Sequence, residues 1–320
     1  MTFDPEPIQT TKTAHPRVVS LLPSATEIVC AVGAADGLVG ISHECDHPPS
    51  IRDRRVLTKS RVAPVGSSRA IDRAVRSAAR DALSVYQVDE VALAELAPDI
   101  IVTQDLCEVC AVSLDDVRSA VARAHRDDIE IMSLKPTRLQ DMLDDVKRVA
   151  TQLGRREQGV RVRSALESRI EGIRLRSAAA STRPRVVSIE WLDPVMLGGT
   201  WMPELIELAG GTPCGVRAGA PAPTVSPSDL VALDPEVVLL KPCGFTLERT
   251  LRERDVIETQ IRGPLGSKVR VVATDGNAYF NRPGPRLVES LEILAAVLHP
   301  ELFPDFVNAH ASVIVPLDAR

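Results

Sequence analysis

Residues 137–180 contain no proline, although the chain of 320 residues has 24. Two helical patterns fill this stretch, with apolar residues at steps of three and four. The first comprises Leu139, Met142, Leu143, Val146, Val149, Ala150 and Leu153, and the second comprises Val162, Leu166, Ile170 and Ile173. Gly154 separates them, as a helix C-cap or a kink would. The second pattern predicts a helix over about residues 155–180, roughly 35–40 Å long and as wide as a small domain.

Similar sequences flank this helix on both sides. PRVVS occurs at residues 16–20 and again at 184–188. LAPDIIV at residues 96–102 is followed by LDPEVVL at 233–239. Two motifs that recur in the same order favour two similar halves joined by one long helix, with a cleft between them. The alternative is that PRVVS is a common way to begin a strand and that the repetition arose by chance.

Apolar runs that alternate with helical patterns predict an α/β fold of two Rossmann-like lobes, with mostly parallel sheets, joined by the long interdomain helix. Strands are expected at residues 17–21, 38–41, 100–103 and 129–134, and at 186–189, 237–240 and 269–273. We divide the chain into a disordered tail (1–15), an N-terminal lobe (16–136), a helical linker (137–183) and a C-terminal lobe (184–320). Ser24, with Glu27 three residues later, has the spacing of a capping box at the first helix.

Composition narrows the classes of partner. Hydrophobic residues make up 44% and charged residues 25%, as in a globular protein, and the net charge is −5. The acidic balance argues against nucleic acid or an anionic membrane as a partner, and no apolar run is long enough to insert into a bilayer. We expect a monomer.

The N-terminal residues, MTFDPEPIQTTKTAHP, are polar and lack the apolar core of a signal peptide. The chain as given is therefore expected in the cytoplasm, or in the periplasm or another extracytoplasmic space if the true start codon lies upstream. The six cysteines, at irregular spacing in a reducing compartment, would be thiols or ligands.

Scarce aromatic residues gather at the strand ends of the second half. Aromatic residues are only 3% of the chain. Those in or beside these loops are Trp191, Trp201, Phe245, Tyr279 and Phe280. Ligands of open α/β sheets bind beyond the carboxyl ends of the strands, so these rings could form a platform for a large, flat, partly apolar ligand. The alternative is that each ring packs inside its own lobe.

Potential metal ligands follow two strands of the first half. His43, Glu44, Cys45 and Asp46 follow the second strand, and Cys107, Glu108 and Cys110 follow the third. One reading is a metal or iron–sulfur site formed by His43, Cys45, Cys107 and Cys110. The others are a redox dithiol, and cysteines that pack as small hydrophobic residues.

No catalytic or nucleotide-binding motif is present. The chain has no G-x-G-x-x-G, no phosphate loop, no G-x-S-x-G and no evident pair of acid and base carboxylates. We therefore predict a binding cleft and no enzyme activity. A less favoured hypothesis is an enzyme that uses Cys45 or Cys107 as a nucleophile on a tetrapyrrole.

The chain resembles the helical-backbone substrate-binding proteins of ABC importers (class III), whose ligands are vitamin B12, iron siderophores and haem. The resemblance lies in VVSLLPSATE (18–27), LVGIS (38–42) with DHPP (46–49), LAPDIIV (96–102), VS (225–226) with DP (234–235), and YF (279–280) with PR (285–286). It is closest to the cobalamin-binding branch.

The resemblance implies non-enzymatic binding of a corrinoid between two lobes, with no cofactor, in partnership with an importer permease. Glu90 and Asp229 are the nearest candidates for acidic residues that dock on a permease. His43 or a thiol is a candidate for direct contact with cobalt. The ligand-binding residues expected are Pro23, Ser24, Ser42, His43, Glu44, Cys45, Asp46, Gln104, Cys107, Glu190, Trp191, Trp201, Pro242, Cys243, Asn277, Tyr279 and Phe280.

Overall fold

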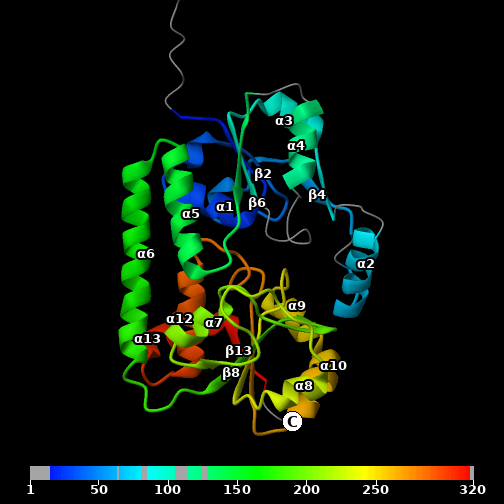
Figure 1. The fold of residues 1–320 in the computed structure, drawn as a ribbon, viewed down its shortest axis with the longest axis vertical. Helices are drawn as coiled ribbons and strands as arrows, with labels where there is room; N and C mark the ends of the chain where they lie inside the picture. The colour runs from blue at the N-terminus through cyan, green and yellow to red at the C-terminus, as the bar shows by residue number, and fades with distance from the viewer. Residues whose placement is uncertain (1–14, 63–64, 81–84, 105–113, 124–127, 318–320) are drawn as a thin grey trace, which may run out of the picture.

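Two α/β lobes lie one above the other, and helix α6 (Arg156–Ser177) runs along one side of both (Figure 1). The structure is a computed structural model and describes residues 15–62, 65–80, 85–104, 114–123 and 128–317. The two-lobe α/β fold confirms the prediction from the repeats. Within the described residues, no helix has the combination of length and apolar character that a bilayer span requires.

The first lobe is built on a sheet of five parallel strands. Their order is β3 (Arg55–Val56), β2 (Leu38–Ile41), β1 (Val18–Ser20), β6 (Ile100–Gln104) and β7 (Glu130–Leu134). The helices of this lobe are α1 (Pro23–Ala31), α2 (Ser68–Arg80), α3 (Glu90–Leu96) and α4 (Leu114–Arg123). Strands β1 and β6 are buried throughout, which explains why they read as continuous apolar runs. A separate antiparallel pair is formed by β4 (Thr58–Ser60) and β5 (Tyr86–Val88).

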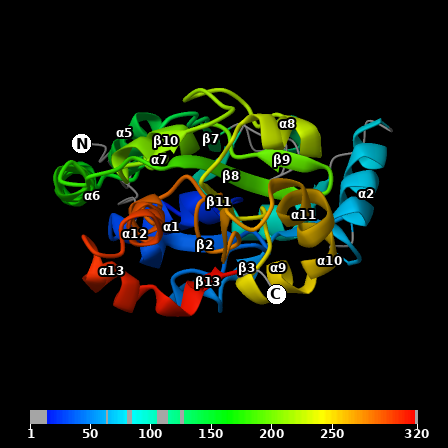
Figure 2. The same cartoon turned by 90° about the horizontal axis from the view of Figure 1, so that it is seen from below.

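The second lobe repeats the plan with one reversed edge. Its strand order is β10 (Thr212–Pro213), β8 (Arg185–Leu192), β11 (Val237–Leu240), β12 (Arg270–Thr274) and β13 (Ile314–Pro316). Strand β13 is antiparallel to β12, and β9 (Val195–Leu197) is antiparallel to β8. The helices here are α7 (Met202–Leu208), α8 (Pro227–Ala232), α9 (Leu247–Arg252), α10 (Arg254–Ile257), α11 (Gly263–Leu265), α12 (Leu287–Leu298) and α13 (Pro304–Ala309). Seen from below, helices lie on both sides of the strands (Figure 2).

Several details differ from the sequence predictions. Ser24 is not an N-cap, because Pro23 occupies the first turn of α1 and the cap position is Leu22. Residues 247–262 do not form one continuous helix but are divided into α9, α10 and a π-helical turn. Helix α2 and the short strands β3, β4, β5, β9, β10 and β13 were not predicted. The limits of the domains stay predictions, and most of the N-terminal tail lies outside the described residues.

The bridge consists of two packed helices, α5 (Leu139–Gln152) and α6. With 22 residues, α6 is about 33 Å long. Gly154, at φ +68°, supplies the left-handed conformation between the helices, and Gly159 brings α6 close to Ala150 of α5.

The far end of α6 is attached to the second lobe. Arg169 donates to Glu292 of α12 at 2.7 Å, and the Arg176 guanidinium lies 4.3 Å from the ring centroid of Phe303. One apolar core cluster also extends from α1 through α5 and α6 to α12. The bridge is therefore packed continuously against both lobes.

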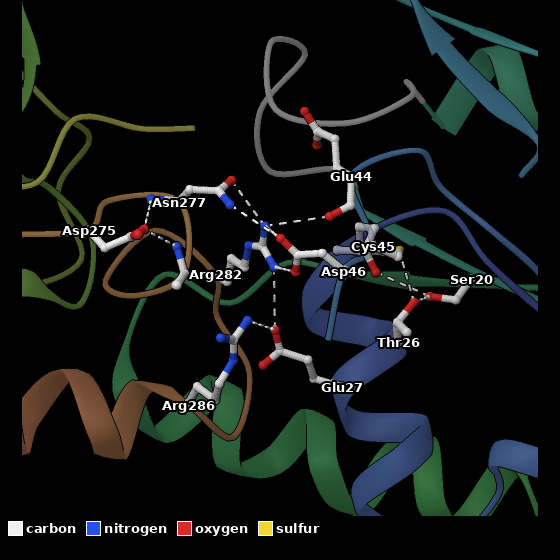
Figure 3. A network of polar contacts seen from close by, with 12 residues as sticks. Ser20, Thr26, Glu27, Glu44, Cys45, Asp46, Asp275, Asn277, Arg282 and Arg286 are labelled. Carbon is white, nitrogen blue, oxygen red and sulfur yellow. Dashed lines mark hydrogen bonds and ion pairs between the residues drawn. The ribbon is translucent and has the colours of Figure 1, made fainter. Parts of the chain in front are cut away.

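A network of charged residues joins the lobes between the loops that follow β2 and β12 (Figure 3). Asp46 accepts from Arg282 at 2.5 Å and from the Asn277 amide at 3.2 Å. Buried Glu27 of α1 accepts from Arg286 at 2.5 Å and lies 3.7 Å from Arg282. Two carboxylates of the first lobe thus meet two guanidinium groups of the second.

The N-terminal end of α2 makes a second connection between the lobes. Ser68 donates through its backbone N–H and its hydroxyl to buried Glu253, at 3.2 and 3.0 Å. Arg249 bridges Glu253 and the Gly66 carbonyl, and Arg69 donates to Asp193 at 2.7 Å. The lobes are therefore connected at α2 as well as at the charged network and α6.

A pair of glycine substitutions tests the helix bridge. A Cβ at position 159 would lie 2.3 Å from the Ala150 Cβ, whereas a Cβ at exposed Gly172 would meet nothing within 4 Å. We expect Gly159→Ala to lower the free energy of unfolding by about 1–3 kcal/mol through overpacking. Gly172→Ala should raise it by about 0.5–1 kcal/mol through helix propensity. Urea denaturation measures both, and equal effects would contradict close packing of α5 on α6.

Acid should weaken the charged network. Burial raises the pKa of Asp46, but the hydrogen bonds from Arg282 and Asn277 outweigh it and hold that pKa below its ordinary value. A carboxylate with a lowered pKa stabilises the fold above its unfolded pKa of about 3.9, and this contribution is lost as pH falls through the folded pKa.

We therefore expect Asp46→Asn to reduce the free energy of unfolding at pH 7, because it removes the ion pair with Arg282. The loss should be only about 1 kcal/mol, because Asp46 is partly exposed and water screens the pair. The deficit relative to the unmodified chain should shrink below about pH 4. Chemical denaturation at both pH values measures this, with the exposed Asp36→Asn as control. A deficit that is independent of pH would show that the ion pair is not its source.

Candidate functional site

The carboxyl ends of the two parallel sheets face each other. This follows from the contact between Asp46, after β2, and Arg282, after β12. The same edges carry the loops after β8 and β11. Ligands of parallel α/β sheets bind at this end of the strands. The candidate site is therefore the region between these facing loops. A hollow of about 580 Å³ lies beside α2, between residues 65–67 and residues 249–256.

Three side chains of the second lobe, Trp191, Phe245 and Arg249, are in contact with one another in turn. Trp191, at the end of β8, lies 5.1 Å from Phe245 between ring centroids, at an interplanar angle of 58°. The Arg249 guanidinium lies over the same Phe245 ring, 4.3 Å from its centroid. Trp191 is partly exposed, and its indole N–H is buried without a hydrogen-bond partner. Trp191 is thus partly accessible, and its ring contacts Phe245.

A buried lysine forms an ion pair with Glu190, the residue before Trp191. Lys241, directly after β11, is 1% exposed. Its ammonium group donates to Glu190 at 3.0 Å and to Asn281 at 2.7 Å. Since an unpaired buried charge is costly, these partners keep Lys241 in place and neutralise its charge locally.

The first lobe contributes polar groups from the loop after β2. The backbone N–H of His43 donates to the Thr58 hydroxyl at 3.0 Å, and the ring Nδ1 lies 2.7 Å from the same oxygen. The Tyr86 hydroxyl donates to Glu44 at 2.9 Å, and the rings of Tyr86 and His43 are 5.4 Å apart. His43 is exposed, and partial burial of its ring, only partly opposed by Glu44, lowers its pKa.

Cys45 does not have the character of a metal ligand. It is 7% exposed and lies 3.1 Å from the Thr26 hydroxyl. Burial raises the pKa of its thiol to about 12, so the thiolate that binds metals or attacks electrophiles is disfavoured. Cys107 and Cys110 lie outside the described residues. Among the residues that are described, no group of three or more His, Cys, Asp or Glu side chains could hold a metal ion. The metal-handling hypothesis is therefore not supported.

Two of the predicted ligand-contact residues are buried inside the second lobe. Phe280 is 0% exposed and Trp201 is 5% exposed, and both belong to the apolar core. The Trp201 indole donates to the Phe280 carbonyl at 2.8 Å, so each residue fixes the other inside the lobe. For these two rings the alternative reading, packing inside the lobe, is the one that the structure bears out.

The remaining predicted residues divide by exposure. Those at least partly accessible are Pro23, His43, Glu44, Asp46, Glu190, Trp191, Cys243, Asn277 and Tyr279. Those buried beneath them, besides Cys45, are Ser24, Ser42, Gln104 and Pro242. A buried side chain can position the site but does not offer its surface to a ligand. Cys107 lies outside the described residues.

Several residues that shape this region were not among the predicted contacts. They are Glu27, Thr58, Tyr86, Lys241, Arg249, Arg282 and Arg286. A signal existed for the last two, because arginines flank Pro-Gly-Pro in a strand-end loop. Nothing in the local sequence indicated that Thr58, on β4, meets His43.

The fold is shared with solved binding proteins. A periplasmic haem-binding protein from Pseudomonas aeruginosa is 18% identical, with a TM-score of 0.66, over 95% of this chain and 96% of that one. The periplasmic vitamin B12 binding protein BtuF of Vibrio cholerae is 19% identical, with a TM-score of 0.62, over 90% and 98%. A possible iron-binding protein from Staphylococcus epidermidis is 16% identical, with a TM-score of 0.66, over 88% and 98%.

A search of curated proteins gives no match. The family model described as periplasmic binding protein matches residues 18–262, which cover the first lobe, the bridge and part of the second lobe. Together with the two facing sheets and the packed helix α6, this match shows that the chain belongs to the periplasmic binding protein family.

Proposed function

We propose that this protein binds a corrinoid, cobalamin, between its two lobes without transforming it, and that it works with an ABC importer permease. The family supports small-molecule binding of this general type. Similar folds belong to proteins described as binding haem and vitamin B12, so the choice of ligand depends on the chemistry of this chain. For the cellular compartment we keep the prediction from the sequence, which is the cytoplasm, or an extracytoplasmic space if the true start codon lies upstream.

The observation that carries the choice of cobalamin is charge balance at the facing loops. Lys241 contacts Glu190, Arg249 contacts Glu253, Arg282 contacts Asp46, and Arg286 contacts Glu27. Haem carries two propionates and many ferric siderophores are anionic, so both would be favoured by cations that are not already paired. The rim of a corrin carries mainly amides, which polar but charge-balanced loops can hydrogen-bond.

The Trp191–Phe245 pair supplies the apolar part of such a site. An aromatic ring supported from behind can pack on the flat or edge surface of a macrocycle. The packed bridge and the connection at α2 fix the separation of the lobes, which makes selection by shape effective. These features support a corrinoid whose amides meet the loops and whose apolar surface meets Trp191.

Docking on a permease through Glu90 and Asp229 is part of the same proposal. Glu90 receives two hydrogen bonds from Arg123, and Asp229 forms a capping box with Ser226 at the start of α8. Both carboxylates are therefore already oriented by their own lobe. A permease arginine would have to share them with these partners.

Ligand-dependent stability tests the proposal. A ligand that binds only the folded state raises the melting temperature, by an amount equivalent to about 2.7 kcal/mol at one hundred times its Kd. We expect a concentration-dependent rise with cyanocobalamin, and a smaller or absent rise with hemin, a ferric siderophore or zinc, measured by differential scanning fluorimetry. Stabilisation by hemin or a siderophore alone would overturn the choice of cobalamin.

Two tryptophan substitutions separate ligand contact from core packing. Trp191→Ala should weaken cyanocobalamin binding about tenfold, because it removes the exposed ring. Trp201→Phe should lower the melting temperature but leave the Kd nearly unchanged, because Trp201 is buried in the lobe. Isothermal titration calorimetry measures both. A larger affinity loss in Trp201→Phe would place the ligand elsewhere.

A further inference from the structure

Thr58 fixes the hydrogen-bonding state of the His43 ring. The Thr58 hydroxyl donates to the Ser42 hydroxyl at 3.0 Å, which uses its single hydrogen. It accepts from the His43 backbone N–H at 3.0 Å and lies 2.7 Å from Nδ1. A hydroxyl has one donor and two acceptor positions, so Nδ1 must carry the hydrogen and donate to Thr58. In a neutral imidazole this leaves the Nε2 lone pair available.

The ring is held in place as well as polarised. Its two contacts with Thr58 restrain the backbone and the side chain together, and Tyr86 lies beside it at 5.4 Å between ring centroids. A histidine that ligates a metal through one nitrogen usually donates from the other to a fixed acceptor, which sets the tautomer and the ring direction. His43 meets this requirement and is exposed on the loop.

The loop that carries His43 reaches the second lobe. Three residues later, Asp46 makes the ion pair with Arg282 and the hydrogen bond with Asn277 (Figure 3). The stretch 43–46 therefore belongs to the edge of the first lobe that faces the second. A ligand held between the lobes would lie within reach of this edge.

We propose that Nε2 of His43 coordinates the metal of the bound corrinoid, an inference that rests on the proposed function. In aquocobalamin the step is a ligand exchange. The Co–O bond to the exchangeable water breaks, a Co–N bond forms from the Nε2 lone pair, and water leaves, with no change in the oxidation state of cobalt. His43 then binds the centre of the ligand, while the loops bind its rim.

Neighbouring groups are less suited to this role. Cys45 is buried as a protonated thiol. Tyr86 is largely buried and its hydroxyl donates to Glu44. The Nε2 lone pair left by the Thr58 contact belongs to the neutral imidazole, which is the form that coordinates a metal.

Absorption spectra of the full chain, in a buffer free of imidazole, test the inference. Mixing with aquocobalamin should shift the visible and near-ultraviolet bands of the corrin as nitrogen replaces water. The shift should be absent in His43→Ala and retained in His47→Ala, which changes an exposed histidine of the same loop. Thr58→Val should weaken aquocobalamin binding by about tenfold, the low end for loss of a partner that orients a metal ligand.

Cyanocobalamin separates failure of the inference from failure of the proposed function. Its cyanide resists displacement, so cyanocobalamin cannot form the Co–N bond and its binding reports corrinoid recognition alone. His43→Ala should therefore weaken the binding of aquocobalamin at least tenfold more than the binding of cyanocobalamin. If cyanocobalamin binds but aquocobalamin shows no shift, or the shift survives in His43→Ala, coordination by His43 is wrong and corrinoid binding stands. If neither cobalamin binds, the proposed function fails and the inference fails with it.

Discussion

The ion pairs that Arg282 and Arg286 form with Asp46 and Glu27 determine how the two lobes face each other. Three of these four side chains are largely buried, so each charge needs its partner to offset the loss of hydration. Removing one partner would leave a buried charge unpaired, which is more costly than the pair is stabilising. The network thus selects one arrangement of the lobes, which the packing of α6 on both then makes rigid.

The parts of the fold that the sequence predicted are those in which local pattern and tertiary environment agree. Strands such as β1 and β6 are buried along their whole length, so their residues are uniformly apolar. The helix bridge shows a regular apolar stripe because one face packs against both lobes. Helix α2 has a short apolar face, with Ile71 buried and Val75 packed on the core of the first lobe. Its position depends on the Ser68–Glu253 contact, which joins residues 185 apart in sequence and is invisible to local periodicity.

Strand-end location predicted where the aromatic residues lie but not which way they point. Phe280 adopts φ +68°, and its backbone N–H is held by the Ser290 hydroxyl, so its ring turns into the core. Trp201 turns inward to donate to the Phe280 carbonyl. Trp191, at the end of β8, is only partly buried. These directions follow from backbone dihedrals and single hydrogen bonds that residue type alone does not encode.

Charge pairing also constrains how a ligand can be recognised here. An anionic ligand would have to compete with Glu27, Asp46, Glu190 or Glu253 for their cations, and would leave a carboxylate unpaired in a partly buried place. A neutral macrocycle avoids that cost, but amides and apolar packing alone orient a large disc only weakly. A directional bond from a fixed imidazole to the metal at its centre would supply the missing orientation. In the proposed corrinoid complex, the tautomer of His43 would therefore contribute to selectivity alongside the charge balance that disfavours anions.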